Sequence, residues 1–173
     1  MTEADREIAA HADPTLGQYF LVSPQKLAKL VSAAGIRPSD DVVEVGAGIG
    51  TVARTLPQSK SLTLVEFDSR FLGPLKQNVP HARVIHGDAL EIITTISFDV
   101  LIGNLPHHVT ESLIAILPGL SFRTAVLSVA ESADLRQLGA GLTWSEVERV
   151  TGDDFIPSQP GISRIVRVVP SRS

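Results

Sequence analysis

Apolar residues along the chain follow two spacings in turn, and this pattern predicts strands that alternate with helices. Five short apolar runs, rich in β-branched residues and bounded by glycine or polar residues, are typical of buried strands. They cover residues 42–45, 61–66, 82–86, 98–103 and 124–130. A further pair, at 145–150 and 164–169, is expected to close the sheet in antiparallel fashion.

The segments between these runs carry apolar residues three and four positions apart, which indicates helices with one buried face. We expect such helices at 24–34, from Thr51 onward, at 69–78, at 111–117 and, short and polar, up to Leu138. At the first helix, Ser23 is the expected N-cap, Pro24 occupies the first turn and Gly35 ends the helix.

Strands in alternation with helices predict an α/β fold, with a seven-stranded, mostly parallel sheet and helices on both of its faces. The chain has 173 residues, enough for one domain with a sizeable core. We therefore expect a single domain at residues 17–173. Residues 1–16 show no clear period and are expected to form a flexible arm with at most a short helix.

Composition narrows the class of protein. Hydrophobic residues make up 43% and charged residues 20%, as in an ordinary soluble domain, and no apolar run reaches the roughly 18 residues needed to cross a bilayer. The polar N-terminus does not resemble a secretory signal, so we expect a cytoplasmic protein. The chain has no cysteine, which excludes disulfides and thiolate chemistry. A net charge of −4 excludes a globally attractive field for phosphates.

The first strand runs directly into a glycine-rich turn, Gly46-Ala47-Gly48-Ile49-Gly50. Glycines let the backbone turn with positive φ and approach a ligand closely. The N–H groups of a helix that starts at Thr51 would face a polar or anionic ligand group. This turn therefore predicts a nucleotide-type site.

Chemistry-bearing residues follow three more strands. Glu66 ends the second strand, Asp88 follows the third and Asn104 follows the fourth. In parallel sheets the ligand lies beyond the carboxyl ends of the strands, so these residues should meet at one site. Glu66 lies about twenty residues beyond the glycine turn, where an acid can accept hydrogen bonds from two ribose hydroxyls. Asp88 alone is also typical of a simple turn.

The glycine turn does not fit two common cofactor motifs. The dinucleotide fingerprint requires glycine where this chain has Thr51, and no P-loop lysine follows. Glu44, Gly46, Gly48 and Gly50 instead resemble the first motif of S-adenosylmethionine-dependent methyltransferases. That resemblance implies that Glu66 binds the ribose and that Asp88 accepts from the adenine amine.

Three further segments narrow the resemblance to one family. Residues 17–21 look like a GQNFL motif, residues 103–106 match an NLPY or NIPY loop, and residues 154–163 resemble an FxPxPxVxS segment. These are the motifs of the ribosomal RNA adenine dimethyltransferases, the group of the KsgA and Erm enzymes. The resemblance runs in order from Gly17 to Val169. It implies a Rossmann-like class I methyltransferase fold, S-adenosylmethionine as cofactor, and methyl transfer to an RNA amine in rRNA processing.

The resemblance also implies roles for individual residues. Asn104 and the carbonyl of Leu105 would hold the target amine, and Phe155 would stack on the extracted base. A core position for Phe155 is the equal alternative. The implied cofactor-binding residues are Gln18, Tyr19, Leu21, Glu44, Gly46, Ala47, Gly48, Glu66, Phe67, Asp88, Ala89 and Asn104.

Several departures leave the acceptor open. His107 stands where the family has tyrosine, and Tyr19 stands where it has asparagine. The chain is also expected to lack the helical C-terminal domain that assists RNA docking. His107 could act as a proton acceptor for the amine or hydroxyl of a small molecule. The alternatives are therefore a small-molecule N- or O-methyltransferase and a cofactor-binding module with little activity. No metal site is expected, because no further ligand lies at a suitable spacing from His107 and His108.

Overall fold

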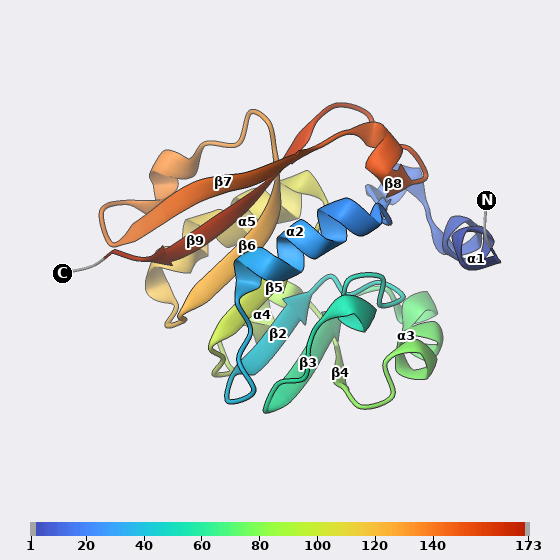
Figure 1. The fold of residues 1–173 in the computed structure, drawn as a ribbon, viewed down its shortest axis with the longest axis horizontal. Helices are drawn as coiled ribbons and strands as arrows, with labels where there is room; N and C mark the ends of the chain where they lie inside the picture. Colours follow the sequence, from blue (N-terminus) through green and yellow to red (C-terminus); the bar gives the residue numbers. More distant parts are fainter. Residues whose placement is uncertain (1–2, 172–173) are drawn as a thin grey trace.

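The central sheet of the computed structural model, which describes residues 3–171, has seven strands in the order β4-β3-β2-β5-β6-β9-β7 (Figure 1). Neighbours from β4 to β6 run parallel, whereas β9 is antiparallel to both β6 and β7. The predicted seven-stranded, mostly parallel sheet is confirmed. Its strands are β2 (Asp41–Val45), β3 (Ser61–Glu66), β4 (Arg83–His86), β5 (Val100–Gly103), β6 (Thr124–Ala130), β7 (Leu142–Val150) and β9 (Ser163–Pro170).

Helices cover both faces of the sheet, with α2 in front and α5 behind in Figure 1. The α-helices are α1 (Glu3–His11), α2 (Pro24–Ala34), α3 (Leu72–Asn78), α4 (Ala89–Ile92) and α5 (His107–Ile116). Short 3-10 turns lie at Pro14–Leu16, Ala53–Thr55, Ser69–Phe71, Leu117–Gly119, Leu135–Leu138 and Gly152–Asp154. No helix within residues 3–171 is long and apolar enough to cross a membrane.

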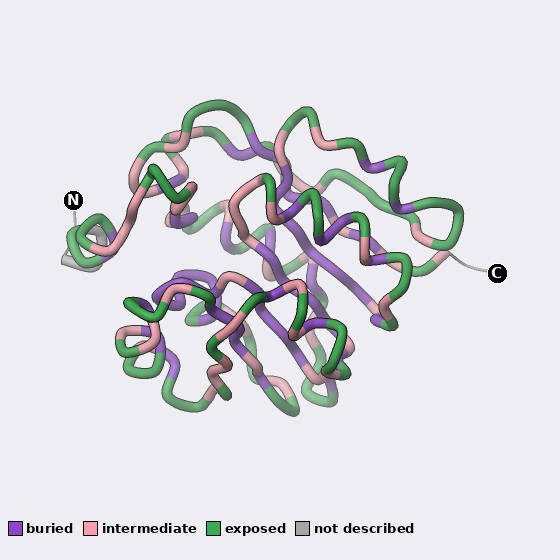
Figure 2. The backbone as a smooth tube through the Cα atoms, turned by 180° about the vertical axis from the view of Figure 1, so that it is seen from behind, coloured by how far each residue is buried: buried purple, intermediate pink, exposed green. Residues whose placement is uncertain are grey.

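The core lies in two layers, one on each face of the sheet, because successive side chains of a strand point to opposite faces. Val42 packs with Leu27 and Leu30 of α2, whereas Val43 packs with Leu113 on the α5 face. The central strands are buried along most of their length (Figure 2). Continuous apolar runs are therefore the expected sequence signal for such strands.

Two helix boundaries differ from the sequence-based expectation. The helix expected from Thr51 is only the 3-10 turn Ala53–Thr55. Leu56 is extended, with φ −71° and ψ 140°, because the following Pro57 disfavours a helical conformation at the residue before it. In contrast, α5 begins at His107, earlier than the expected 111–117. The first change removes an anion site from the glycine turn, and the second places His107 in the first turn of a helix.

A second, two-stranded sheet was not expected. It joins β1 (Phe20–Leu21) to β8 (Phe155–Ile156) in antiparallel register. The N-terminal arm contains α1, whose Ile8 is buried in a small cluster with Phe20 and Phe71. The arm is thus attached to the domain through Ile8, and its separation as a flexible unit stays a prediction.

Candidate active site

One cavity of about 810 Å³ lies at the carboxyl ends of β2, β3, β4 and β5. Its volume is within the roughly 300–1,000 Å³ of small-molecule sites. Most of the residues singled out in the sequence line it, namely Gln18, Tyr19, Glu44, Gly46, Ala47, Gly48, Glu66, Phe67, Asp88, Ala89, Asn104, Leu105 and His107. Residues separated by up to ninety positions in the chain are thus brought together at one edge of the sheet.

The glycine turn after β2 needs glycine for two physical reasons. Gly46 and Gly48 have φ of +69° and +56°, in the left-handed region. A Cβ on Gly46 would overlap the side chain of Leu105, and one on Gly48 would lie 2.5 Å from Cε1 of Phe20. The turn therefore packs directly against both the loop after β5 and the N-terminal motif.

Glu66 is tied to the glycine turn and to the segment after β3. Its Oε2 accepts from the Gly48 amide at 2.6 Å and its Oε1 accepts from the Asp68 amide at 2.8 Å. Burial raises the pKa of the Glu66 carboxyl, although these two amide hydrogen bonds act in the opposite direction. The acid expected to bind ribose is therefore held at the cavity wall in a defined orientation.

Asp68 is a cavity residue that sequence reasoning missed. Its carboxylate pairs with Arg70, and Oδ2 accepts from Nε2 of Gln18 at 2.9 Å. The hydrogen bond from Arg70 holds the pKa of Asp68 well below its ordinary value. The Gln18 amide, whose Oε1 also accepts from the Asp13 N–H, links the arm to this segment. The feature of the sequence that could have identified Asp68 is the Asp-x-Arg spacing just after the end of a strand.

Glu44 presents a different environment. Its side chain is 1% exposed, and Oε2 has no hydrogen-bond partner among the described residues. Burial, together with the nearby charge of Glu66, raises its pKa well above the ordinary value. A buried oxygen without a partner costs free energy, so this cavity wall favours a ligand that can donate to it.

The loop after β5 supplies further polar groups to the cavity. The Asn104 side chain is half-buried, and the hydrogen bonds of residues 3–171 include none from its amide. The buried Thr110 hydroxyl lies 3.3 Å from the carbonyl oxygen of Leu105 and 3.4 Å from that of Pro106, so its hydrogen is shared between the two. Gly17 packs against Pro106, so the N-terminal motif touches this loop.

His107 takes part in a triangle of polar side chains. Its Nε2 lies 3.1 Å from Oγ of Ser163 and 3.0 Å from Nε2 of Gln159. Burial lowers the pKa of the His107 ring, against the opposing charge of Glu111. Gln159 also lines the cavity, and no local signal could have paired it with a residue 52 positions away.

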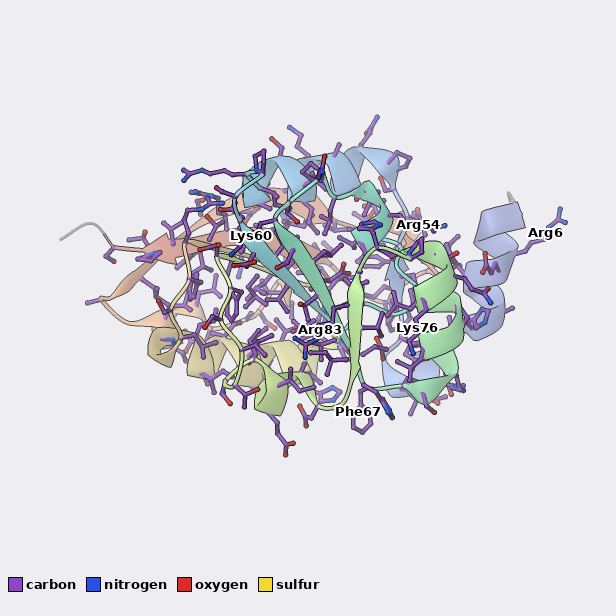
Figure 3. The ribbon with its side chains drawn as sticks, turned by 90° about the horizontal axis from the view of Figure 1, so that it is seen from below. Arg6, Arg54, Lys60, Phe67, Lys76 and Arg83 are labelled. Carbon is purple, nitrogen blue, oxygen red and sulfur yellow. The ribbon has the colours of Figure 1, made fainter. Side chains whose placement is uncertain are left out.

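Asp88 and Phe67 lie at the other end of the cavity. Oδ1 of Asp88 accepts from the Leu90 amide at 2.8 Å and so caps α4, as expected of a turn residue. Phe67 is 73% exposed, and its ring points away from the body of the molecule in Figure 3. Both residues can therefore meet a ligand from the solvent side.

Two residues singled out in the sequence do not line the cavity. Leu21 is fully buried and Phe155 is only 4% exposed, and both belong to the core on the α2 face. They face each other across the β1–β8 pair, whose register was not visible in the sequence. In this structure Phe155 is thus a core residue, and it offers no surface on which a base could stack.

The charge of the cavity restricts its ligand. Its described lining includes four acids, Glu44, Glu66, Asp68 and Asp88, and no lysine or arginine. The exposed basic side chains labelled in Figure 3, such as Arg54 and Lys76, are not among the lining residues. A pyrophosphate would find no cationic side chain among these lining residues, whereas a cationic ligand with hydroxyl donors would be favoured. The described part of the chain holds no cluster of metal-ligating side chains.

Known proteins resemble this chain over most of its length. The family described as Ribosomal RNA adenine dimethylase matches residues 10–140. A ribosomal RNA small subunit methyltransferase A from Malacoplasma penetrans is 35% identical over 71% of this chain and 48% of its own length. The chain thus spans about half the length of that curated relative.

Two solved structures share the fold. A dimethyladenosine transferase from Plasmodium falciparum superposes with a TM-score of 0.78 and 27% identity, over 88% of this chain and 63% of the other. The 23S rRNA methyltransferase ErmE superposes with the same TM-score and 22% identity, over 89% and 70% of the two chains. The expected methyltransferase fold is confirmed.

Proposed function

Because the chain belongs to the ribosomal RNA adenine dimethylase family, we propose that it transfers a methyl group from S-adenosylmethionine to an adenine amine of ribosomal RNA. The observation that carries this proposal is the acid-lined cavity that Asn104 also lines. Such an acceptor would place the reaction in the cytoplasm, the compartment expected from the sequence.

The residues present fit this cofactor. Glu66 would bind the ribose hydroxyls, because its carboxylate is held at the end of β3 by the Gly48 amide. The unpartnered Oε2 of Glu44 would accept from the ammonium group, and the acidic lining would stabilise the positive sulfonium. Gly46 and Gly48, which have no side chains, let the turn pack closely against Leu105 and Phe20 at the cavity wall. When bound, the cofactor supplies an electrophilic methyl group.

The loop after β5 would orient the acceptor. An adenine amine is a weak nucleophile because its lone pair is conjugated with the ring. Two acceptors on its hydrogens, the Asn104 side-chain oxygen and the Leu105 carbonyl, favour a pyramidal nitrogen whose lone pair can attack. Catalysis then rests mainly on proximity and orientation. No strong base is needed before attack, since the proton leaves the product afterwards.

The test compares Asn104→Ala with Gln58→Ala, a change at an exposed glutamine outside the cavity. Transfer of labelled methyl groups to ribosomal RNA should fall by at least about 100-fold in Asn104→Ala, while the cofactor Kd measured by calorimetry changes little. Unchanged transfer by Asn104→Ala would refute the proposed role of the amide. Label that enters small molecules instead of RNA would identify a small-molecule methyltransferase. Cofactor binding without any transfer would identify a binding module.

A further inference from the structure

Two departures from the family's motifs meet at one wall of the cavity. His107 stands in place of the tyrosine of the NLPY loop. When residues 155–163 are placed on the FxPxPxVxS pattern, Phe155, Pro157 and Ser163 match, and Gln159 replaces the second proline. The side chains of His107 and Gln159 nevertheless lie in hydrogen-bond contact, 3.0 Å apart. The two replacements therefore form one feature of this chain.

Ser163 completes the contact and makes it rigid. Nε2 of Gln159 lies 3.2 Å from Oγ of Ser163, which is 1% exposed at the start of β9. The Gln159 backbone N–H donates to the carbonyl of Gly152, and a side chain on Gly152 would overlap the Gln159 carbonyl. Gln159 is thus held from both its backbone and its side chain, so its amide has a defined direction.

The chemistry of the amide determines the state of the imidazole. An amide nitrogen only donates, and that of Gln159 lies within hydrogen-bond distance of both Nε2 of His107 and Oγ of Ser163. Where this nitrogen donates to Nε2 of His107, Nε2 accepts, and in the neutral ring the proton is then on Nδ1. The neighbours from the β8–β9 loop and from β9 carry no charge. Glu111, one turn along α5, is the charged group that acts on the ring, and burial outweighs it by lowering the pKa of His107.

We propose that Gln159 is a positioning residue that keeps His107 neutral with its proton on Nδ1. Nδ1 then carries the hydrogen-bond donor of this cavity-lining residue, while the lone pair of Nε2 is engaged by the Gln159 amide. This step rests on the proposed function. The Nδ1–H hydrogen-bond donor fits a methyl-accepting base whose amine is next to a ring nitrogen, as in adenine. His107 would therefore help to recognise the base and would not act as the proton acceptor considered from the sequence.

The first experiment uses the protein without cofactor or RNA. Long-range ¹H–¹⁵N correlation spectra of histidine-labelled protein report which ring nitrogen carries the proton, and His107→Phe identifies the signals by their loss. At neutral pH we expect the Nδ1–H form. In Gln159→Glu, the carboxylate should accept from Nε2 and raise the pKa of His107 by about one to three pH units. Gln58→Glu makes the same charge change at an exposed position and should leave the titration of His107 unchanged.

The second experiment measures the pH profile of methyl transfer. If a neutral His107 is required, the acidic limb of kcat/KM should move upward by the same one to three pH units in Gln159→Glu and should not move in Gln58→Glu. An Nε2–H ring in the wild-type protein, or equal titrations in the two glutamate variants, would overturn the inference. An Nδ1–H ring in a protein that transfers no methyl group would support the inference and refute the proposed function.

Discussion

Replacement of Gly48 by alanine should destabilise the protein by about 2–5 kcal/mol, and the structure divides this cost into two parts. A residue with a side chain pays about 1–2 kcal/mol to adopt the left-handed conformation that Gly48 has at φ +56°. The added Cβ would also lie 2.5 Å from Cε1 and 3.2 Å from Cδ1 of Phe20. Such overpacking costs about 1–3 kcal/mol.

Phe20 has little room to move away from the new methyl group. Its ring is 7% exposed and packs edge-to-face on Phe71, with the centroids 5.6 Å apart. It also belongs to the buried cluster that includes Ile8 and Ile49. The overlap must therefore be relieved by displacement of the glycine turn, which holds Glu66 through the Gly48 amide.

Gly35 provides a matched control for the conformational part of the destabilisation expected at Gly48. It has φ +52°, and a Cβ there would meet nothing within 4 Å. Gly35→Ala should therefore cost only the conformational 1–2 kcal/mol. Urea unfolding followed by circular dichroism measures both variants, and in a domain of this size each kcal/mol also lowers Tm by about 2–4 °C. Equal losses in Gly48→Ala and Gly35→Ala would refute the steric reasoning.

A double-mutant cycle isolates the contact itself. Phe20→Leu removes the ring atoms that the new Cβ would meet, so it should cost less in the Gly48→Ala background than in the wild-type protein. We expect a coupling free energy of at least about 1 kcal/mol. Losses that add to within about 0.5 kcal/mol would show that the two sites are independent.

Three further predictions concern buried groups. Because the pKa of Glu44 is raised, its contribution to the free energy of unfolding is complete below the unfolded-state pKa of 4.5 and is lost as pH rises through the folded-state pKa. In urea titrations, the free energy of unfolding of Glu44→Gln relative to wild type should therefore increase from pH 5 to pH 8. An equal difference between the two proteins at both pH values would argue against this. Arg123 forms an ion pair with the buried carboxylate of Asp40, and Arg123→Met leaves that carboxylate without its partner. This change should lower the free energy of unfolding by about 3–5 kcal/mol. A loss under about 1 kcal/mol would mean that the pair is not effectively buried. Phe155→Ala should cost about 3–5 kcal/mol in the same assay, as expected of a core residue and not of an exposed stacking platform.

Much of the sheet could be predicted because burial on both faces leaves a local signal. The bounds of β3 and β6 agree with the predicted runs at 61–66 and 124–130, since each strand is a mainly apolar segment flanked by charged residues within two positions. The helix expected after Gly50 was wrong because the pattern of apolar positions outweighed the effect of Pro57 on the residue before it. The β1–β8 pair is too short to show any period.

The sequence by itself determined which residue types stand at the strand ends, because strand spacing and parallel order bring Gly48, Glu66 and Asn104 to one edge of the sheet. Only the tertiary structure decided what each side chain does there. The burial of Phe155 and the contact between His107 and Gln159 depend on segments far apart in the chain, whose packing leaves no periodic trace in the sequence. Pairing between distant side chains is a property of the folded geometry and not of local pattern.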